Sequence, residues 1–436
     1  MAVCAGDEPA DLTPILTPIR EKFQAPGVAA AAIRDGRLIA LGASGVRDLH
    51  SQEPVALADR SLIGSCGKAA TRLLVGRLVD KKLLRWDSSL AELFPDMAMR
   101  DEYKTVTIGD IIGHRGGIQP YTMISPQRTP ILFEVSGSPR ENRAAFIAHL
   151  LSEEPAAPPK TKFVYSNAGY GLLGHIAERV TDKSYEKLMR DEVFGPLGMT
   201  SATVGMPAAV AKFHGWVGHE RTPDGFKPVP ARHGLPGIAP AGMMSCSIED
   251  FAKLGAALVD VESGKPTEFL GSAAIEKLPE LRPGGPGEGQ VFFGGDGHYT
   301  AAFALWPSKG LAIVVQSNAG NSDDLCEAIV KAVRTAVAPE IANDDMIQAG
   351  SPQQRGRYGF QIKAEGDEDT WTVGLVEAGS IAEKAGVKEG DRIIAVNDKA
   401  LSEIPVDDRL AALKQSPVTI RFERAGKPIE FTMRLP

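Results

Sequence analysis

The stretch Ser65-Cys66-Gly67-Lys68 stands at the head of a segment with helical periodicity, and the rest of the chain can be interpreted around it. A helix over about 66–82 with one buried face is predicted by apolar residues at three- and four-residue spacing, namely Ala70, Leu73, Leu74, Leu78 and Val79. On a helix, Ser65 and Lys68 would lie one turn apart on the same face. A serine hydroxyl needs a base within hydrogen-bond reach to act as a nucleophile, and a desolvated lysine with a lowered pKa can help to remove its proton. The motif alone also fits an N-cap serine followed by a solvated lysine.

Length and composition indicate a globular protein of more than one domain. The chain has 436 residues, of which 24% are charged and 43% apolar, so it is too long for one ordinary core and too apolar for a disordered chain. A net charge of −7 argues against a nucleic-acid-binding surface. Because no stretch reaches about 18 uninterrupted apolar residues, the sequence predicts no transmembrane segment.

Residues 1–9 and the four cysteines bear on the compartment in which the protein works. Val3-x-Ala5 has the small-residue pattern of a signal-peptidase site. We therefore expect 1–9 to be a signal-peptide remnant or a disordered N-terminus, and the protein to be periplasmic or secreted; an ordinary cytosolic N-terminus is the alternative. The cysteines are far apart in the sequence, which predicts neither a zinc site nor a disulfide framework.

Two β-hairpins at distant places in the chain suggest the fold class. The segments 28–33 and 37–41 flank Asp35-Gly36, a strong two-residue turn signal, and 300–306 and 311–316 form a second pair. The sequence between the hairpins is mainly helical in pattern. We predict an α/β (α+β) domain, in which both ends of the chain build an antiparallel sheet around an inserted helical region.

A second chemical motif, Tyr165-Ser166-Asn167, precedes the predicted helix that opens near 168. A tyrosine in a cationic pocket can have a lowered pKa and serve as a general base. The amide of Asn167 could orient Lys68 or the substrate through hydrogen bonds. The alternative interpretation is the entry to a helix with a buried tyrosine.

Together the two motifs resemble those of the serine β-lactamases and penicillin-binding-protein-like hydrolases, and Tyr-x-Asn is similar to the class C β-lactamases and their esterase relatives. The resemblance covers about 10–337 and includes the segment 105–118, in which His114 would pack at the rim of the cleft. It implies an acyl-enzyme mechanism with Ser65 as nucleophile. Lys68 and Tyr165 would be the proton-transfer pair, and Asn167 a positioning group.

The chain departs from the family at two places. Gly67 stands where the family usually has serine or threonine. The family's third motif, Lys-Thr-Gly or His-x-Gly on an edge strand, corresponds here to Phe293-Gly294-Gly295, which is similar to the Trp-Gly-Gly of some esterases. The backbone there could still donate an N–H to an oxyanion, together with that of Ser65.

The missing cation in the third motif bears on the substrate. Without a positive charge to bind a carboxylate, neutral esters or amides are favoured over β-lactams and peptides ending in D-alanine. A shifted register would bring His298 to the site instead; otherwise His298 is a surface histidine at the sheet edge. We expect a serine hydrolase of the esterase or amidase kind. A β-lactamase or D,D-peptidase, or a catalytically weak sensor protein, is the alternative.

Other hydrolytic chemistries lack their motifs. The chain has no Gly-x-Ser-x-Gly nucleophile elbow. Its eight histidines are scattered, and none forms His-Glu-x-x-His. We expect no cofactor and no metal.

The composition changes after the hydrolase-like region. Residues 338–355 are polar and rich in turn-forming residues, which predicts a linker. Residues 356–436 resemble a PDZ domain of the kind found in bacterial envelope proteases, through the runs Gly-Ser-x-Ala-Glu-Lys-Ala-Gly at 379–386 and Gly-Asp-Arg-Ile-Ile-Ala-Val-Asn at 390–397.

This resemblance implies a site for the C-terminus of a peptide. Arg357-Tyr358-Gly359-Phe360 matches the carboxylate-binding loop, against which a peptide adds as an extra strand. The groove would lie between Phe360–Ile362 and a helix bearing Leu410 and Leu413. The alternative is a domain that packs on the hydrolase and binds nothing.

Overall fold

The computed structural model describes residues 8–122, 124–205, 215–222, 225–230, 234–278, 287–344, 346–348, 358, 360–364, 371–376, 380–404, 409, 412–413 and 417–434. The chain divides into two compact units, Met1–Gly350 and Ser351–Pro436. Each unit is described by itself below. Among the described residues, no helix is both long and apolar enough to cross a membrane.

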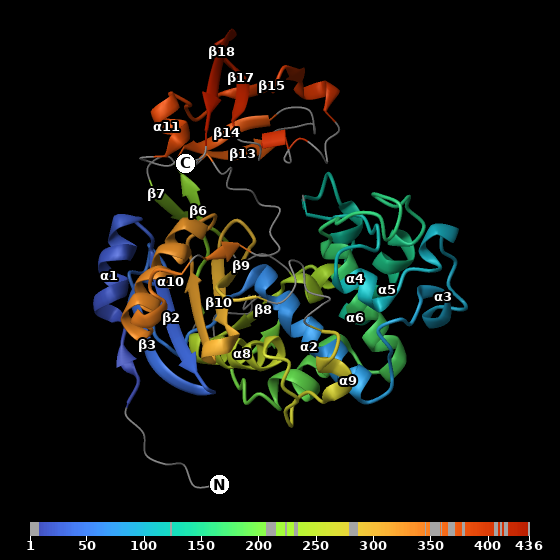
Figure 1. The fold of residues 1–436 in the computed structure, drawn as a ribbon. Helices are drawn as coiled ribbons and strands as arrows, with labels where there is room; N and C mark the ends of the chain where they lie inside the picture. The colour runs from blue at the N-terminus through green and yellow to red at the C-terminus, as the bar shows by residue number, and fades with distance from the viewer. Residues whose placement is uncertain are drawn as a thin grey trace. The chain divides into compact units, whose positions relative to one another are not determined.

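The first unit is built on a seven-stranded sheet with the strand order β1-β3-β2-β11-β10-β9-β12 (Figure 1). The five central strands are antiparallel to one another, while β1 pairs with β3 and β12 with β9 in parallel at the two edges. The strands come from the two ends of the unit: β1 (Ala10–Asp11), β2 (Gly27–Arg34), β3 (Arg37–Gly45), β9 (Gln290–Gly295), β10 (Thr300–Trp306), β11 (Leu311–Ser317) and β12 (Ile347–Gln348). This arrangement confirms the predicted sheet and both predicted hairpins.

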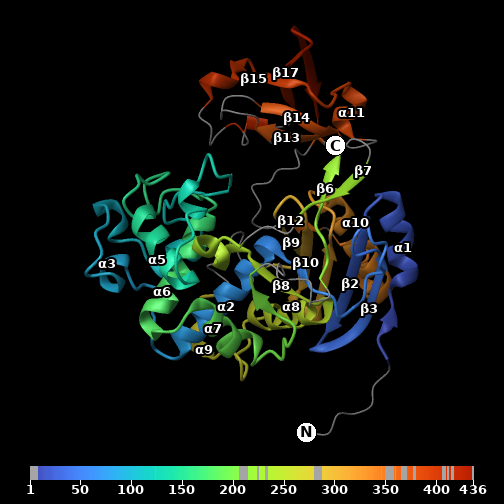
Figure 2. The same cartoon turned by 180° about the vertical axis from the view of Figure 1, so that it is seen from behind.

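Helices cover both faces of the sheet. On one face, α1 (Thr13–Lys22) lies beside α10 (Asp323–Val337), as both views show (Figures 1 and 2). On the other face, α8 (Ile248–Glu262) packs on β2 and β11. Strand β2 serves both cores with small side chains, since Ala30 and Ala32 face one and Ala29 and Ala31 the other.

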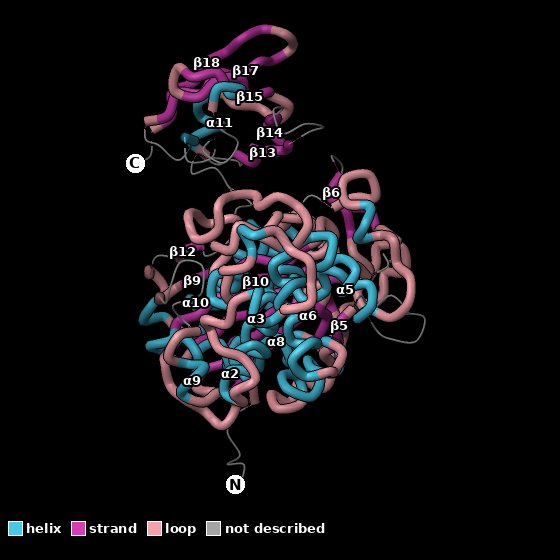
Figure 3. Tube along the Cα trace, turned by 90° about the vertical axis from the view of Figure 1, so that its right-hand side faces the viewer, coloured by secondary structure: helices cyan, strands magenta, loops and turns pink. Residues whose placement is uncertain are grey.

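The inserted region is mainly helical, and its helices are cyan in Figure 3. Serine and threonine N-caps with acidic N3 partners start several of them, as at Ser89, Thr107 and Ser138. The helices are α2 (Gly67–Asp80), α3 (Leu90–Leu93), α4 (Ile108–Ile112), α5 (Pro139–Leu150), α6 (Asn167–Thr181), α7 (Tyr185–Leu188) and α9 (Ser272–Ile275). Short strands complete the unit: β4 (Ser61–Leu62), β5 (Thr203–Val204) and β8 (Met244–Cys246) form one sheet, and β6 (His219–Thr222) and β7 (Gly225–Pro228) another.

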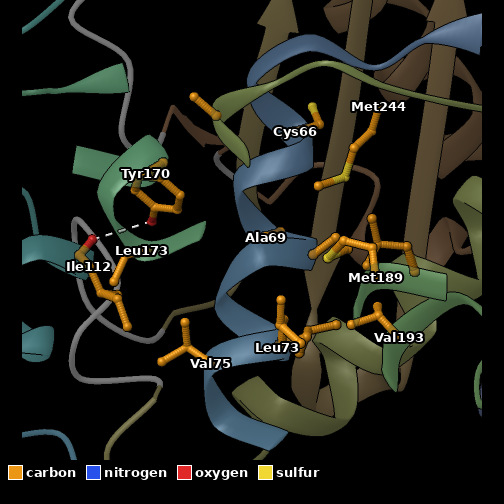
Figure 4. Packing of buried hydrophobic residues seen from close by; sticks show 14 of the residues in the cluster. Cys66, Ala69, Leu73, Val75, Ile112, Tyr170, Leu173, Met189, Val193 and Met244 are labelled. Carbon is orange, nitrogen blue, oxygen red and sulfur yellow. Dashed lines mark hydrogen bonds between the residues drawn. The ribbon is translucent and has the colours of Figure 1, made fainter. Parts of the chain in front are cut away.

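Helix α2 lies deeper than the sequence predicts. Instead of one buried face, nearly all of its residues are buried. Figure 4 shows the cause, since α2 runs between Tyr170 and Leu173 of α6 on one side and Met189 and Val193 on the other. A helix enclosed in this way can hold a lysine away from water.

The segment predicted as a linker begins later than 338. Ala338 and Ile341 are buried in the core under α1 and α10, and Ile347–Gln348 pairs with β9 as β12. These apolar side chains and the strand pairing place 338–344 and 346–348 in the first unit, whereas 345 and 349–355 lie outside the described residues.

The second unit is a small sheet with its own core. The strand order is β13-β14-β15-β17-β18, with β16 (Lys399–Ala400) paired to β15. The guanidinium of Arg424, at the end of β17, donates to both oxygens of the Asp391 carboxylate just before β15, at 2.6 and 2.7 Å. Its other elements are β13 (Phe360–Ala364), β14 (Trp371–Val376), α11 (Ile381–Ala385), β15 (Arg392–Val396), β17 (Val418–Arg424) and β18 (Lys427–Met433). The predicted β-rich unit is confirmed.

Candidate active site

Ser65 lies in the tight turn Gly64–Cys66, called the nucleophile turn below, which leads directly into α2. Gly64 bends the chain here with a φ of 50°, a conformation that glycine adopts without strain. A methyl group on Gly64 would come within 2.2 Å of the Gly295 nitrogen, so the turn touches strand β9 directly. The first N–H groups of a helical turn have no acceptor inside it, which leaves the N–H of Ser65 suited to a ligand.

Lys68 is buried, with 6% of its surface exposed, and its Nζ lies close to three oxygens. These are Ser65 Oγ at 3.1 Å, Asn167 Oδ1 at 2.7 Å and the Ala241 carbonyl oxygen at 2.8 Å. Burial lowers the pKa of Lys68 from 10.5 to about 7, because the ammonium loses its hydration. The predicted lowering of this pKa is confirmed, and Lys68 is suited to act as a base near neutral pH.

The surroundings of Lys68 also direct its lone pair. A neutral amine has two N–H donors and one lone pair, and an amide or peptide carbonyl oxygen can only accept. Asn167 Oδ1 and the Ala241 oxygen therefore take both N–H groups, and the lone pair is left for the Ser65 hydroxyl. The orientation of Asn167 is fixed from its other end, since Nδ2 donates to the Tyr121 carbonyl at 2.9 Å.

Tyr165 contacts Ser65 as a donor. Its hydroxyl donates to Ser65 Oγ at 2.9 Å. Burial raises the pKa of Tyr165 well above its usual range, although the hydrogen bond to Ser65 acts in the opposite direction. The predicted lowering of this pKa is therefore wrong. Lys68 Nζ lies 4.8 Å from the ring centre, but it loses its charge near pH 7 and offers no cation where the phenol would ionise.

Strand β9 passes behind the nucleophile turn. A methyl group on Gly294 would lie 2.3 Å from the Ile63 oxygen and 2.7 Å from the Ser65 nitrogen, so only glycine fits there. Phe293 points to the opposite face of the sheet, where it packs on the core under α1 and α10. The predicted stretch thus meets the turn through the backbone of Gly294 and Gly295, while the Phe293 side chain faces away from it.

His298 lies in the turn between β9 and β10 and is buried, with 6% of its surface exposed, so it is not a surface histidine. Its Nδ1 is 3.7 Å from the Asp296 carboxylate, and its carbonyl oxygen accepts from the N–H of His219 at 3.0 Å. These contacts hold His298 on the β6 side of the hairpin turn, beyond the end of strand β9.

A further part of the site is the turn Pro236–Ala241, in which three backbone carbonyl oxygens accept hydrogen bonds from side chains. Arg143 donates to the Pro236 oxygen, Thr71 to that of Pro240 and Lys68 to that of Ala241. We did not predict a role for this turn from the sequence. The run from Pro240 to Met243 was the available signal, since Gly242 packs against Gly64 and Ser65.

Packing explains why glycine stands at position 67. A methyl group there would meet the sulfur of Met244 at 3.2 Å, and Figure 4 shows the Met244 side chain beside α2 below Cys66. The space beside the nucleophile that the glycine leaves is therefore occupied by the thioether of Met244.

In the second unit, the structure describes part of the predicted peptide site. Tyr358 and Phe360 are buried in the core of the unit, and Ile362 is partly buried there. Arg357, Gly359 and Leu410 lie outside the described residues. Among the described residues, strand β13 stands at the end of the strand order, and an end strand of a sheet is where an added strand can pair.

A serine between a buried lysine and a tyrosine, beside an antiparallel sheet, is the arrangement of a serine hydrolase with a lysine base. The beta-lactamase family pattern matches residues 14–335, and the chain belongs to this family of serine hydrolases. A PDZ domain pattern matches 347–423. Among the described residues, no three His, Cys, Asp or Glu side chains are grouped so as to hold a metal ion.

Known relatives agree with this placement. Penicillin-binding protein 4 of Amycolatopsis lactamdurans is 32% identical over 206 residues, which cover 46% of this chain and 50% of that protein. A D-aminopeptidase of Cereibacter sphaeroides is 27% identical over 234 residues, covering 52% and 42%. The chain spans about half the length of these curated relatives. The structure of EstCE1, a hydrolase with promiscuous acyltransferase activity, shares the fold, with a TM-score of 0.59, 16% identity and coverage of 73% of this chain and 96% of that one.

Proposed function

We propose that the protein hydrolyses neutral esters or amides through an acyl-enzyme on Ser65. The observation that carries the proposal is the pair of contacts to Ser65 Oγ, from Lys68 Nζ at 3.1 Å and from the Tyr165 hydroxyl at 2.9 Å. One nucleophile with a base and a proton donor both in reach meets the requirement for covalent acyl transfer.

The residues divide the reaction between them. Neutral Lys68 accepts the proton of Ser65 as Oγ forms its bond to the carbonyl carbon. The N–H groups of Ser65 and Gly295 stabilise the oxyanion. Tyr165 and the Lys68 ammonium return a proton to the leaving group as its bond to the acyl carbon breaks. A water molecule then loses a proton to the same pair as its oxygen forms a bond to the acyl carbon. The bond between that carbon and Ser65 Oγ breaks, and the pair returns the proton to Oγ, which frees the acid product and restores Ser65.

Substitution of Ser65 tests the proposal. Ser65→Ala should lower the turnover of a nitrophenyl ester by roughly 10⁴-fold or more, and the losses for Lys68→Ala and Tyr165→Phe should not add, because the three groups act as a unit. A fluorophosphonate probe should label Ser65 in the native protein, as read by mass spectrometry. Near-native turnover by Ser65→Ala would refute the proposal.

We further propose a preference for uncharged substrates. Strand β9 meets the nucleophile turn through glycine backbone, and no lysine lies in the segment Gln290–Gly295. The absence of one charge-assisted hydrogen bond corresponds to about 1.5–3 kcal/mol, or roughly 10–150-fold in binding. Short neutral esters should therefore be hydrolysed better than cephalosporins or D-alanyl-D-alanine peptides. If the native protein hydrolyses penicillin efficiently and His298→Ala abolishes this activity alone, the cation that binds the substrate carboxylate would instead be His298.

For the PDZ unit we propose binding of a peptide with a free C-terminus along the β13 edge. Backbone N–H groups near Phe360 would face the carboxylate. The full-length protein should bind such peptides and not their amidated forms, as measured by fluorescence anisotropy. Equal binding of both forms would contradict the carboxylate site.

A further inference from the structure

His114 is a buried residue beside the candidate site for which the mechanism above has no role. It follows α4 in the left-handed conformation, with a φ of 56°, and only 3% of its surface is exposed. Histidine is among the residues that enter this conformation more readily than most. Its own N–H donates to the Ile111 carbonyl at 3.1 Å, which anchors it to the end of the helix.

His114 contacts the residues before and after Tyr165 in the chain, and also the Tyr165 ring. The carbonyl oxygen of His114 accepts from the N–H of Val164 at 2.7 Å, and its ring nitrogen Nδ1 accepts from the N–H of Ser166 at 3.1 Å. These are the two residues on either side of Tyr165 in the chain. The imidazole also packs on the Tyr165 ring, with 4.6 Å between ring centres.

The bond to Ser166 requires His114 to be neutral, because Nδ1 accepts only when it carries no proton. Burial, with the nearby charges of Lys68 and Arg72, lowers the pKa of His114 to about 3. The acceptor is therefore present at every pH at which Lys68 is a base.

We propose that His114 is the positioning residue for Tyr165, holding the backbone on both sides so that the hydroxyl stays on Ser65 Oγ. The inference rests on the proposed acyl-enzyme function for its effect on rate. The tyrosine hydroxyl sits at the end of a long side chain, so a small shift of its backbone moves it away from the serine. A misplacement of about 1 Å can cost on the order of 10²-fold in rate.

Two substitutions at this position separate the acceptor from the space that it fills. His114→Asn keeps an acceptor oxygen close to the position of Nδ1 and tolerates the left-handed backbone. His114→Leu fills the space without an acceptor and leaves the Ser166 N–H unpaired. Turnover of a nitrophenyl ester per titrated active site should fall about 10–100-fold in the leucine variant, with KM changed by less than about threefold, and should be largely restored in the asparagine variant. If strain prevents the leucine variant from folding, His114→Gly removes the acceptor with a permissive backbone.

A double-mutant cycle tests whether His114 acts through the Tyr165 hydroxyl. In a Tyr165→Phe background, His114→Leu should cause no further loss, since the group that it positions is already absent. Losses that add would overturn the inference, because a general weakening of the fold would act equally in both backgrounds.

Hydrogen exchange gives a measurement that does not depend on catalysis. The amide of Ser166 should exchange faster in His114→Leu than in the native protein or in His114→Asn. The surface substitution His149→Leu on α5 serves as a control. Unchanged exchange of the Ser166 amide in His114→Leu would refute the positioning role, whether or not Ser65 is the nucleophile. Faster exchange together with an active Ser65→Ala variant would instead refute only the acyl-enzyme proposal.

Discussion

Replacing Gly294 by alanine would place a methyl group against the backbone of the nucleophile turn. Its carbon would lie 2.3 Å from the Ile63 oxygen, 2.6 Å from the Cys66 nitrogen and 2.7 Å from the Ser65 nitrogen. Real Cβ atoms essentially never approach closer than 3.0 Å, so strand and turn must move apart by about 0.7 Å at the tightest contact. All three contacts are with backbone atoms, and no flexible side chain can absorb this movement.

The displacement acts where the two proposed oxyanion donors, on Ser65 and Gly295, must converge. The loss of one such donor costs about 10²–10³-fold in kcat, so we expect Gly294→Ala to lower kcat/KM by about 10²-fold, or about 2.7 kcal/mol of transition-state stabilisation. Initial rates with a nitrophenyl ester, normalised to serine titrated by a fluorophosphonate, measure the effect on properly folded sites.

The matched control is Gly234→Ala, because a methyl group on Gly234 meets no atom of the described residues within 4 Å. It should keep native turnover and native thermal stability. If Gly294→Ala stays within about threefold of the native kcat/KM, the close approach of β9 does not shape the oxyanion site, and the proposed pair of backbone donors is wrong at this strand.

Three further predictions follow from the buried charges and the division into units. The kcat/KM for a neutral ester should rise with pH through about 7 and then level off, because the neutral form of Lys68 is the proposed base and its pKa is lowered to about 7; a profile that is flat from about pH 5 to 9 would contradict this role. Arg143→Met should reduce the free energy of unfolding, measured in urea, by about 3–5 kcal/mol, because it removes the guanidinium that pairs with the fully buried Glu178 carboxylate. The exposed pair Arg140–Asp182 provides the control, where Arg140→Met should cost less than about 1 kcal/mol, and equal losses would contradict the reasoning. A chain ending at Gly350 should fold and keep its activity on small esters, whereas one ending at Ala338 should melt lower because it lacks β12 and Ile341; an insoluble 1–350 chain would show that the first unit depends on the second.

The predictable parts of the fold are those with local signals. Asp35-Gly36 marks its hairpin because a two-residue turn requires such residues, and the spacing in Ser65-Cys66-Gly67-Lys68 is enough to bring its serine and lysine together. The Phe293 side chain was harder to place, because a shift of one residue along a strand moves a side chain to the opposite face.

Other parts of the site depend on tertiary contacts for which the sequence has no local signal. Ala241 enters the site through its backbone carbonyl, which any residue type would provide. The pKa of Tyr165 follows from its depth in the protein, and a motif contains no information on depth. The same holds for His114, whose type gives no hint that its ring nitrogen receives the N–H of Ser166.

The two fixed acceptors of Lys68 lie 99 and 173 residues downstream of it in the chain. While the chain is still being synthesised, Lys68 is an ordinary solvated amine with its usual pKa of 10.5, of which only about 0.03% is neutral at pH 7. Its pKa falls only once folding has buried it among segments that include Ala241. For the proposed reaction, folding would thus itself be the activation step, because an immature chain has no base beside Ser65.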